Sequence, residues 1–221
     1  GVPTSRCFKL DRYIRYLFDD HRALDPLTTT CFRSSPVESV LIKIKEAVGK
    51  YANVLSEILK VDVEIVDSNL VRVAGTGRFN VQLDKDMSSE GHVYRRVIER
   101  WEKTVIDNPG QHEACLQCAK QGHCDETFDM SAPIKLYGRV VGVIGFVCFT
   151  ADQKTHIVNN YVAFMNFLDQ ISDLIASKAM EEVERENTLL MMKVLGNVVE
   201  KVEEGVMIVQ QDHLIKMNSA G

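Results

Sequence analysis

The chain has no hydrophobic run long enough to cross a bilayer. Its longest apolar stretch, Val140 to Phe149, is about half of what a membrane-spanning helix needs. No secretory signal opens the sequence. A net charge of −5 also gives little support for a nucleic-acid-binding surface. These absences predict a cytoplasmic protein that contacts neither membrane nor nucleic acid directly in this region.

Catalytic signatures are missing as well. The sequence contains no recognisable nucleophile–base pair and no phosphate-binding loop. We therefore assign no catalytic residues and expect the protein not to be an enzyme. Internal repeats and low-complexity tracts are also absent. At 221 residues the chain can bury a real core in one or two domains.

Cysteine, in contrast, occurs in a distinctive pattern. Three of the six cysteines, Cys115, Cys118 and Cys124, fall in one short loop that contains Gly, Gln and His and few apolar residues. Packing cysteines usually lie among aliphatic side chains, whereas a C-x2-C pair followed by C-x5-C can supply three thiolates to a soft metal. Clustering in a chain of this length favours a reducing compartment over a disulfide framework. We predict that these three cysteines bind a metal centre.

A closed zinc site or a fully ligated [4Fe–4S] cluster needs a fourth ligand. Cys31 is the first choice because thiolate suits an iron–sulfur cluster best. His112 is the second choice, since it would complete a compact Cys3His zinc site, and Cys7 is a third. The fourth position could also stay open. We favour an iron–sulfur cluster, with zinc as the alternative, because sensing needs a reactive centre.

Other residues have simpler interpretations. The three loop cysteines could be thiols without a metal, and His123 is expected to be a solvated loop residue. Cys148 lies in an apolar strand and is expected to be a small buried side chain. Tyr94 and Trp101 are expected to pack in the core. One further set could hold an anionic ligand in a pocket or could form a solvated face; it comprises Arg72, Arg78 and Lys85.

Hydrophobic periodicity predicts the elements before the cysteine loop. Helices are expected at residues 8–20, 36–60 and 92–106. Strands are expected at residues 61–65 and 70–74, joined by a turn at residues 67–69. The first strand is predicted to be half-exposed, because Asp62 and Glu64 alternate with apolar residues.

After the loop, residues 132–137 and 140–149 predict a β-hairpin whose second strand, apolar on both faces, lies centrally in the sheet. Pro133 is expected at the start of the first strand, where no ladder donor is needed. A helix is expected from about Asp152 to Val202. One domain cannot cover so long an apolar stripe, so we predict a homodimer through a parallel partner helix; a kinked helix pair folding back on the sheet is the alternative. Residues 203–221 predict a further hairpin.

The predicted fold is therefore α+β: an antiparallel sheet with flanking helices and a long C-terminal signalling helix. Four segments are expected. They are an N-terminal helix and linker (1–35), a sensory domain (36–152), the long helix (153–202) and the truncated start of another domain (203–221).

Particular segments resemble known signalling domains. Residues 131–146, SAPIKLYGRVVGVIGF, resemble the last hairpin of a GAF domain, and residues 203–209 with 214–220 resemble the start of a PAS domain. Residues 108–134, with the three cysteines, resemble the input region of some bacterial sigma-54-dependent transcriptional regulators. The resemblance implies an input module that controls the assembly or ATPase of a regulator, whose ATPase and DNA-binding domains are not in this chain.

Together these observations predict a sensory module that reports redox state or a small molecule through the cysteine-ligated centre. One alternative is a zinc-stabilised GAF module that binds an organic effector. Another, from the enzyme class, is a GAF-type methionine sulfoxide reductase, which would need a nucleophilic cysteine and a resolving partner.

Overall fold

The computed structural model describes residues 39–210 and 213–219. The N-terminal segment predicted at residues 1–35 lies outside the described residues, together with its expected helix at residues 8–20 and the proposed ligands Cys7 and Cys31. In the described portion of the chain, no helix is both long enough and apolar enough to span a membrane.

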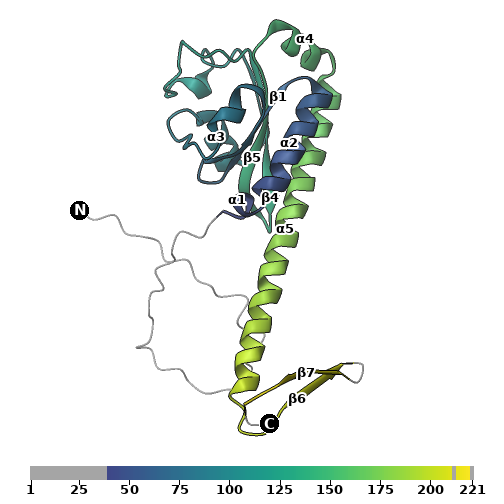
Figure 1. The fold of residues 1–221 in the computed structure, drawn as a ribbon. Coiled ribbons are helices and arrows are strands. Elements are labelled where there is room, and N and C mark those ends of the chain that lie inside the picture. Colours follow the sequence, from purple (N-terminus) through teal and green to yellow (C-terminus); the bar gives the residue numbers. More distant parts are fainter. Residues whose placement is uncertain (1–38, 211–212, 220–221) are drawn as a thin grey trace, which may run out of the picture. The chain divides into compact units, whose positions relative to one another are not determined.

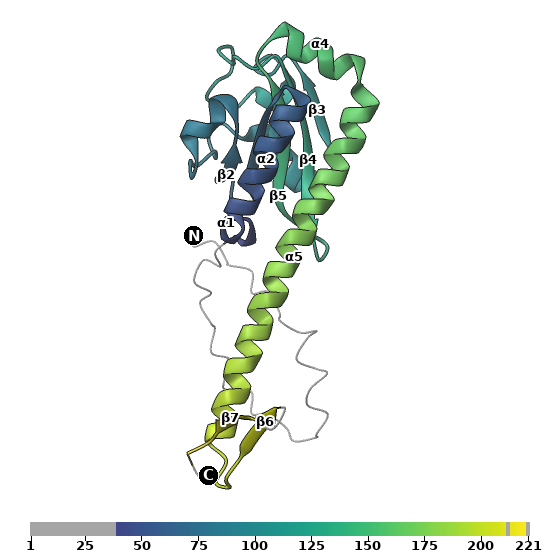
Figure 2. The same ribbon diagram turned by 45° about the vertical axis from the view of Figure 1, so that its right-hand side comes forward.

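Five strands form one antiparallel sheet in the order β2-β1-β5-β4-β3 (Figures 1 and 2). Their bounds are β1 Asp62–Asp67, β2 Arg72–Gly75, β3 Thr104–Asp107, β4 Phe128–Leu136 and β5 Arg139–Cys148. β5 pairs with β1 on one side and β4 on the other, and its second half is buried on both faces. This confirms the predicted hairpin and the central position of its second strand. A strand whose two faces are both covered needs apolar residues on both faces.

Two helices cover one face of the sheet. α2 (Lys45–Leu59) packs on β1 and β2, and α5 (Tyr161–Glu200) packs on β4 (Figures 1 and 2). The short α1 (Val40–Lys43) precedes α2 and is separated from it at Ile44. The main core lies between these helices and the sheet; its fully buried members include Leu41, Val48, Ile65, Ile134, Ile144, Phe146, Leu168 and Ile175.

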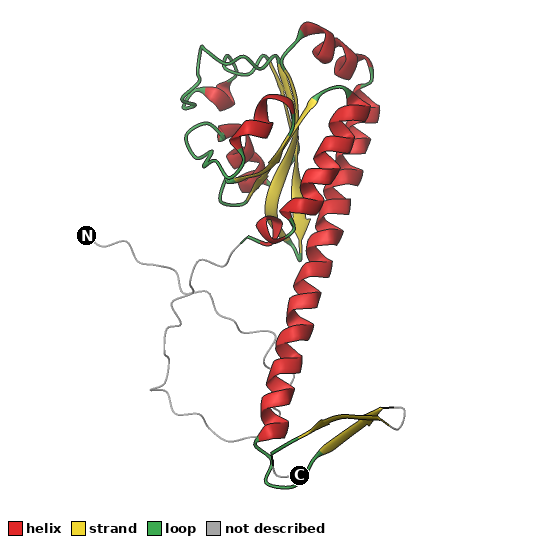
Figure 3. Ribbon diagram, in the orientation of Figure 1, coloured by secondary structure: helices red, strands yellow, loops and turns green. Residues whose placement is uncertain are grey.

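The other face carries α3 (His92–Arg100) and the irregular segments on either side of it (Figure 3). These segments include two 3₁₀ turns, η1 (Gly77–Gln82) and η2 (Glu113–Cys115). A second, smaller core forms here from Val66, Leu70, Met87, Tyr94, Val97 and Val143. The α+β fold predicted from the sequence is thus confirmed: an antiparallel sheet with flanking helices and a long C-terminal helix.

The predicted helix at residues 92–106 is wrong in its last turns. α3 ends at Arg100, and Trp101 adopts a left-handed conformation with φ 62° that stops the helix. Residues 104–107 form β3 instead, pairing with β4 from Thr104↔Ser131 to Asp107↔Phe128. Trp101 is 44% exposed, so its expected core position is also wrong. Tertiary pairing at the sheet edge overrides the local helical pattern.

β1 is buried on both faces rather than half-exposed as predicted. Glu64 is only 2% exposed, because α3 and the cysteine loop cover the face that the sequence pattern assigns to solvent. Pro133 also differs from its predicted position, since it lies inside β4 opposite Val143. It is tolerated there because β3 begins at Thr104, opposite Ser131, so from Ala132 onward one edge of β4 has no neighbouring strand among the described residues.

The long helical region contains one break. α4 (Ala151–Asn159) starts with a capping box between Thr150 and Gln153, and Asn160 separates it from α5. The first half of α5 buries Phe164, Leu168, Ser172, Ile175 and Ala179. Its last turns instead expose large apolar side chains: Leu189, Leu190, Met191, Met192, Val194, Leu195 and Val198.

The predicted C-terminal hairpin is confirmed as β6 (Met207–Gln210) and β7 (His213–Met217). Asn218 holds it to the end of α5, since its side-chain amide donates to the carbonyl groups of Val199 and Val202 at 3.1 and 3.2 Å. The assignment of this hairpin to a PAS domain stays a prediction.

The tight packing around Gly142 in β5 gives a test of the fold. A methyl group at Gly142 would overlap Leu41 and the carbonyl oxygen of Val66, whereas one at Gly49, inside α2, would meet no atom within 4 Å. We expect Gly142→Ala to lower the free energy of unfolding by about 2 kcal/mol through overpacking. Gly49→Ala should raise it by up to about 1 kcal/mol through helix propensity. Urea denaturation of both variants measures this; equal effects would contradict the packing described.

Candidate functional site

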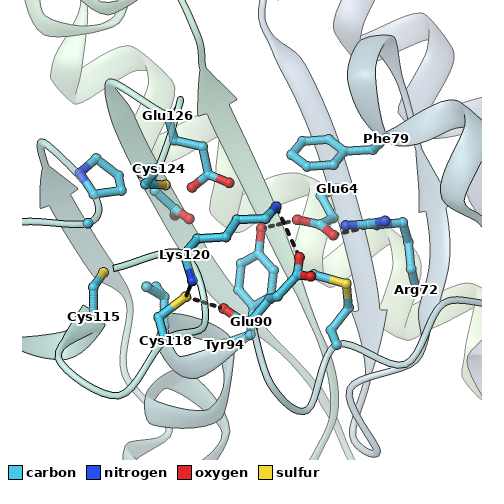
Figure 4. Close-up of a pocket in the computed structure, with 16 residues that line it drawn as sticks. Glu64, Arg72, Phe79, Glu90, Tyr94, Cys115, Cys118, Lys120, Cys124 and Glu126 are labelled. Atoms are coloured by element: carbon cyan, nitrogen blue, oxygen red, sulfur yellow. Dashed lines mark hydrogen bonds and ion pairs between the residues drawn. The ribbon is translucent and has the colours of Figure 1, made fainter. Parts of the chain in front are cut away.

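A small cavity lies between the sheet and the segments that carry α3 and the cysteine loop (Figure 4). Its volume is about 40 Å³, room for a few water molecules at roughly 15 Å³ each. β1 and β2 contribute Glu64 and Arg72, and η1 contributes Phe79. The remaining lining residues are Met87, Glu90, Gly91, Val93, Tyr94, Pro109, Gly110, Cys115, Cys118, Lys120, Cys124, Glu126 and Asp129. Charged groups and sulfur atoms therefore surround a small space.

A buried ion pair forms one wall of this cavity. Arg72 Nε donates to Glu64 Oε1 at 2.5 Å, and both side chains are almost completely buried. Tyr94 on α3 donates its hydroxyl to Glu64 Oε2 at 2.6 Å, and burial raises the Tyr94 pKa well above its usual value. Of the two interpretations left open for Arg72, a pocket and a solvated face, the structure supports the pocket. Tyr94 is a core residue, as predicted, with a polar partner.

The guanidinium of Arg72 is held on three sides. Its Nη1 donates to the backbone and side-chain oxygens of Gln82 at 3.2 and 2.9 Å, and the Phe79 ring lies 4.9 Å from its central carbon. Its Nη2 is buried and has no hydrogen-bond partner among the described residues. A buried donor of a charged group without a partner is costly and uncommon in native proteins.

Two further carboxyl groups reach the cavity without a cationic partner at hydrogen-bond distance among the described residues. Burial, together with the negative charge of Glu64, raises the pKa of Glu126 to about 7. Burial and then Glu126 raise the pKa of Asp129 well above its usual value, although Asp129 accepts a hydrogen bond from the Ser131 hydroxyl. These groups are therefore more readily protonated than surface carboxyls.

Ion pairs close the rim. Glu90 accepts a hydrogen bond from Lys85 at 2.9 Å and lies 3.0 Å from Lys120 of the cysteine loop. Burial raises the pKa of Glu90, but the two lysines more than offset this effect and hold the pKa below its ordinary value. Lys85 thus belongs to the pocket rim, whereas Arg78 is exposed and lies over Phe149.

All three loop cysteines line the cavity. Cys115 is buried, and Cys118 and Cys124 are half-buried. Cys118 Sγ donates to the carbonyl oxygen of Glu90 at 3.4 Å, which links the loop to the rim. Gly110 enables this packing: its φ is 88°, and a side chain there would meet Cys124.

The sulfurs share a cavity but do not form a metal site in this arrangement. Within residues 39–210 and 213–219, no three His, Cys, Asp or Glu side chains are arranged to hold a metal ion. Burial raises the pKa of Cys115, and it raises that of Cys124 to about 11, which favours the thiol over the ligating thiolate. His112 accepts a hydrogen bond from the Ala114 amide and so caps η2 locally. The residues as placed do not fit a closed zinc or iron–sulfur site.

Sequence reasoning misses the acidic side of the site. The alternating pattern of β1 assigns Glu64 to solvent, and neither Glu126 nor Asp129 belongs to a recognised motif. The sequence does hold a signal that Asp129 is buried. This residue stands between the apolar residues Phe128 and Met130, at the start of the buried strand β4. Cys148 is fully buried and His123 is exposed, as predicted.

Comparisons with known proteins give one clear sequence relative. No protein-family model matches the chain. Over 179 residues the chain is 29% identical to the "Putative uric acid sigma-54-dependent transcriptional regulator UacR" of Escherichia coli (strain K12). The match covers 81% of this chain but only 30% of UacR, so the chain spans less than a third of its relative's length.

Three solved structures are similar at lower identity. The GAF domain of A. aeolicus nlh2 aligns at 21% identity and TM-score 0.44, over 66% of this chain and 92% of that chain. The E. coli DhaR(N)–DhaL complex aligns at 14% identity and TM-score 0.47, over 81% of this chain and 62% of that chain. A free methionine-R-sulfoxide reductase from Thermoplasma acidophilum aligns at 12% identity and TM-score 0.44, over 64% of this chain and 96% of that chain.

The raised pKa of Glu126 predicts a pH dependence of stability. An unfolded glutamate loses its proton near pH 4.5, whereas the folded protein keeps it to about pH 7. Because the native state binds more protons in this interval, the free energy of unfolding should fall as pH rises from 4.5 to 7, on the order of 2 kcal/mol.

Glu126→Gln should remove most of this fall, while Asp125→Asn, at the exposed neighbouring position, should leave it unchanged. Urea denaturation at half-unit pH intervals measures both. A Glu126→Gln profile that superimposes on the wild type would contradict the burial of this carboxyl.

Proposed function

We propose that this chain is the signal-receiving region of a sigma-54-dependent transcriptional regulator and is not an enzyme. The similarity to UacR over most of the chain supports the class of regulator. The observation that carries the proposal is the cavity, which is lined by the buried side chains of Arg72 and Asp129 and by the half-buried Glu126. Burying such groups is costly, so a fold selected for stability alone has no reason to gather them there.

The signal we propose first is a small polar molecule bound in this cavity. Donor and acceptor groups converge there beside the apolar surfaces of Phe79, Met87 and Val93, the mixture typical of ligand sites. The name of the relative includes uric acid. An oxopurine of that kind carries ring N–H and carbonyl groups that would complement carboxyl and guanidinium groups, so uric acid is the first compound to test.

A metal or iron–sulfur centre on Cys115, Cys118 and Cys124 is the second candidate. It is favoured by the position of all three sulfurs on one cavity. Since they are not arranged as a metal site here, binding would require the loop to rearrange and a fourth ligand such as Cys31 to join. Zinc would stabilise the loop, whereas an iron–sulfur cluster would make the module responsive to redox state.

A thiol-dependent methionine sulfoxide reductase is disfavoured. Its nucleophilic cysteine would need a lowered pKa, and burial instead raises the pKa of Cys115 and Cys124. Their environment is also acidic, because Glu126 and Asp129 lie nearby and disfavour a thiolate.

Signal transmission follows from the connectivity. The cysteine loop leads directly into β4, which packs along α5. A ligand that changes the order of the loop would therefore shift β4 and the helix that rests on it. The exposed end of α5 is proposed to pair with the same helix of a second copy, so that the shift alters the helix crossing.

The apolar residues at the end of α5 support this homodimer. Within α5, Met191, Leu195 and Val198 repeat at intervals of four and three residues, the spacing of a coiled-coil seam. Each is between 53% and 56% exposed. A stripe of this kind needs a partner to remove it from water.

The two candidate signals can be separated by one set of measurements. The chain is purified without oxygen, its iron, sulfide and zinc are assayed, and uric acid binding is followed by calorimetry. For the first candidate we expect one bound uric acid per chain in metal-free protein. For the second we expect bound metal that is lost in Cys118→Ser and retained in Cys148→Ser, whose sulfur lies in β5 away from the cavity. A chain that binds neither metal nor uric acid would contradict both candidate signals.

Dimerisation is tested on the seam of α5. Leu195→Glu should weaken the dimer at least about ten-fold in dissociation constant, because it places a charge in the apolar contact. Asn197→Glu makes the same substitution away from the seam and should have little effect. Sedimentation equilibrium measures both; a wild-type chain that stays monomeric, or a Leu195→Glu variant that dimerises normally, would refute the proposed pairing.

A further inference from the structure

One nitrogen atom identifies where a ligand would be held. Arg72 is completely buried, and its Nε and Nη1 have partners, but Nη2 has none among the described residues. The side chain lines the cavity, as the close-up shows (Figure 4). Leaving the NH2 group of a buried cation without an acceptor has a free-energy cost that an acceptor in the cavity would reduce.

The orientation of this nitrogen is fixed before any ligand arrives. Glu64 holds Nε, and Tyr94 holds Glu64 from α3. Gln82 holds Nη1, while Phe79 packs on the guanidinium. A donor fixed in this way loses little conformational entropy when it binds, which is the basis of a preorganised recognition site.

Resting on the proposed function, we propose that Arg72 is the ligand-anchoring residue and that its Nη2 donates to a planar carbonyl or carboxylate oxygen of the sensed molecule. Arg suits such an sp² oxygen because its planar donors match the lone pairs in direction. The carboxyl groups of Glu126 and Asp129 line the same cavity and can accept N–H groups of the ligand. The ligand class is thus a small carboxylate or a ring amide.

The size of the cavity adds a condition on entry. About 40 Å³ accommodates a molecule of a few heavy atoms, far less than the several hundred Å³ of a typical organic ligand site. A ring ligand must therefore separate Lys120 from Glu90, the ion pair between the cysteine loop and the rim. Binding of a ring at Arg72 would move the loop that leads into β4, whereas acetate would leave it in place.

The experiment compares oxygen-bearing probes with an oxygen-free one. Binding of uric acid (ring carbonyl) and of acetate (carboxylate) to the chain is measured by calorimetry, with unsubstituted purine as the control compound. Arg72→Lys keeps the charge but removes the fixed planar donor, and Arg78→Lys is the matched change at an exposed arginine. We expect at least one oxygen-bearing probe to bind the wild type, no binding of purine, a loss of ten-fold or more in affinity for Arg72→Lys, and no change for Arg78→Lys.

The outcomes separate this inference from the sensor proposal. Equal probe affinity in the wild type and in folded Arg72→Lys overturns the anchor and leaves the sensor proposal standing. Binding of neither oxygen-bearing probe to the wild type overturns the anchor together with the small-molecule signal, and leaves the metal candidate. If Arg72→Lys does not fold by circular dichroism, a crystal structure of the wild type with the probe decides: an oxygen within about 3.2 Å of Nη2 supports the anchor, and a probe bound elsewhere overturns it.

Discussion

The buried pair of Arg72 and Glu64 is the interaction on which the site depends. It joins β1 to β2 beneath α3, and Tyr94 connects it to that helix. A pair without water around it is stable only when its hydrogen bonds are nearly complete. The protein supplies partners for Nε and Nη1 of Arg72, while Nη2, which lacks one among the described residues, belongs to a side chain that lines the cavity. In the proposed mechanism, structural constraint and ligand recognition therefore meet in one side chain.

The two faces of the sheet differ in composition and in their contribution to stability. The face under α2 and α5 is almost wholly apolar and supplies the stability of the domain. The face under α3 has a small apolar core beside a group of charged residues, which is less favourable energetically. The stability of the apolar face offsets this cost because β5, at the centre of the sheet, contributes side chains to both faces. β4 also belongs to both and therefore connects the cavity with α5.

The cysteine loop takes a different meaning from its position in the fold. Burial, and then the nearby carboxyl groups, raise the pKa of Cys115 and Cys124 and disfavour thiolate chemistry at these two residues in the arrangement described. At the same time Lys120 and Cys118 join the loop to Glu90 at the rim. In the proposed mechanism the loop is a cover over the cavity, and a metal centre would require it to leave that position.

The sequence alone determined the α+β class, the hairpin with a central second strand, the long helix and the confinement of the cysteines to one loop, because each depends on local periodicity or spacing. It could not determine that Glu64 is buried, that residues 104–107 form an edge strand, or that Asp129 and Glu126 line one cavity with Arg72. Those features arise from contacts between segments far apart in the chain. An alternating acidic residue has the same local pattern whether water or another helix covers it, so only the tertiary structure decides which.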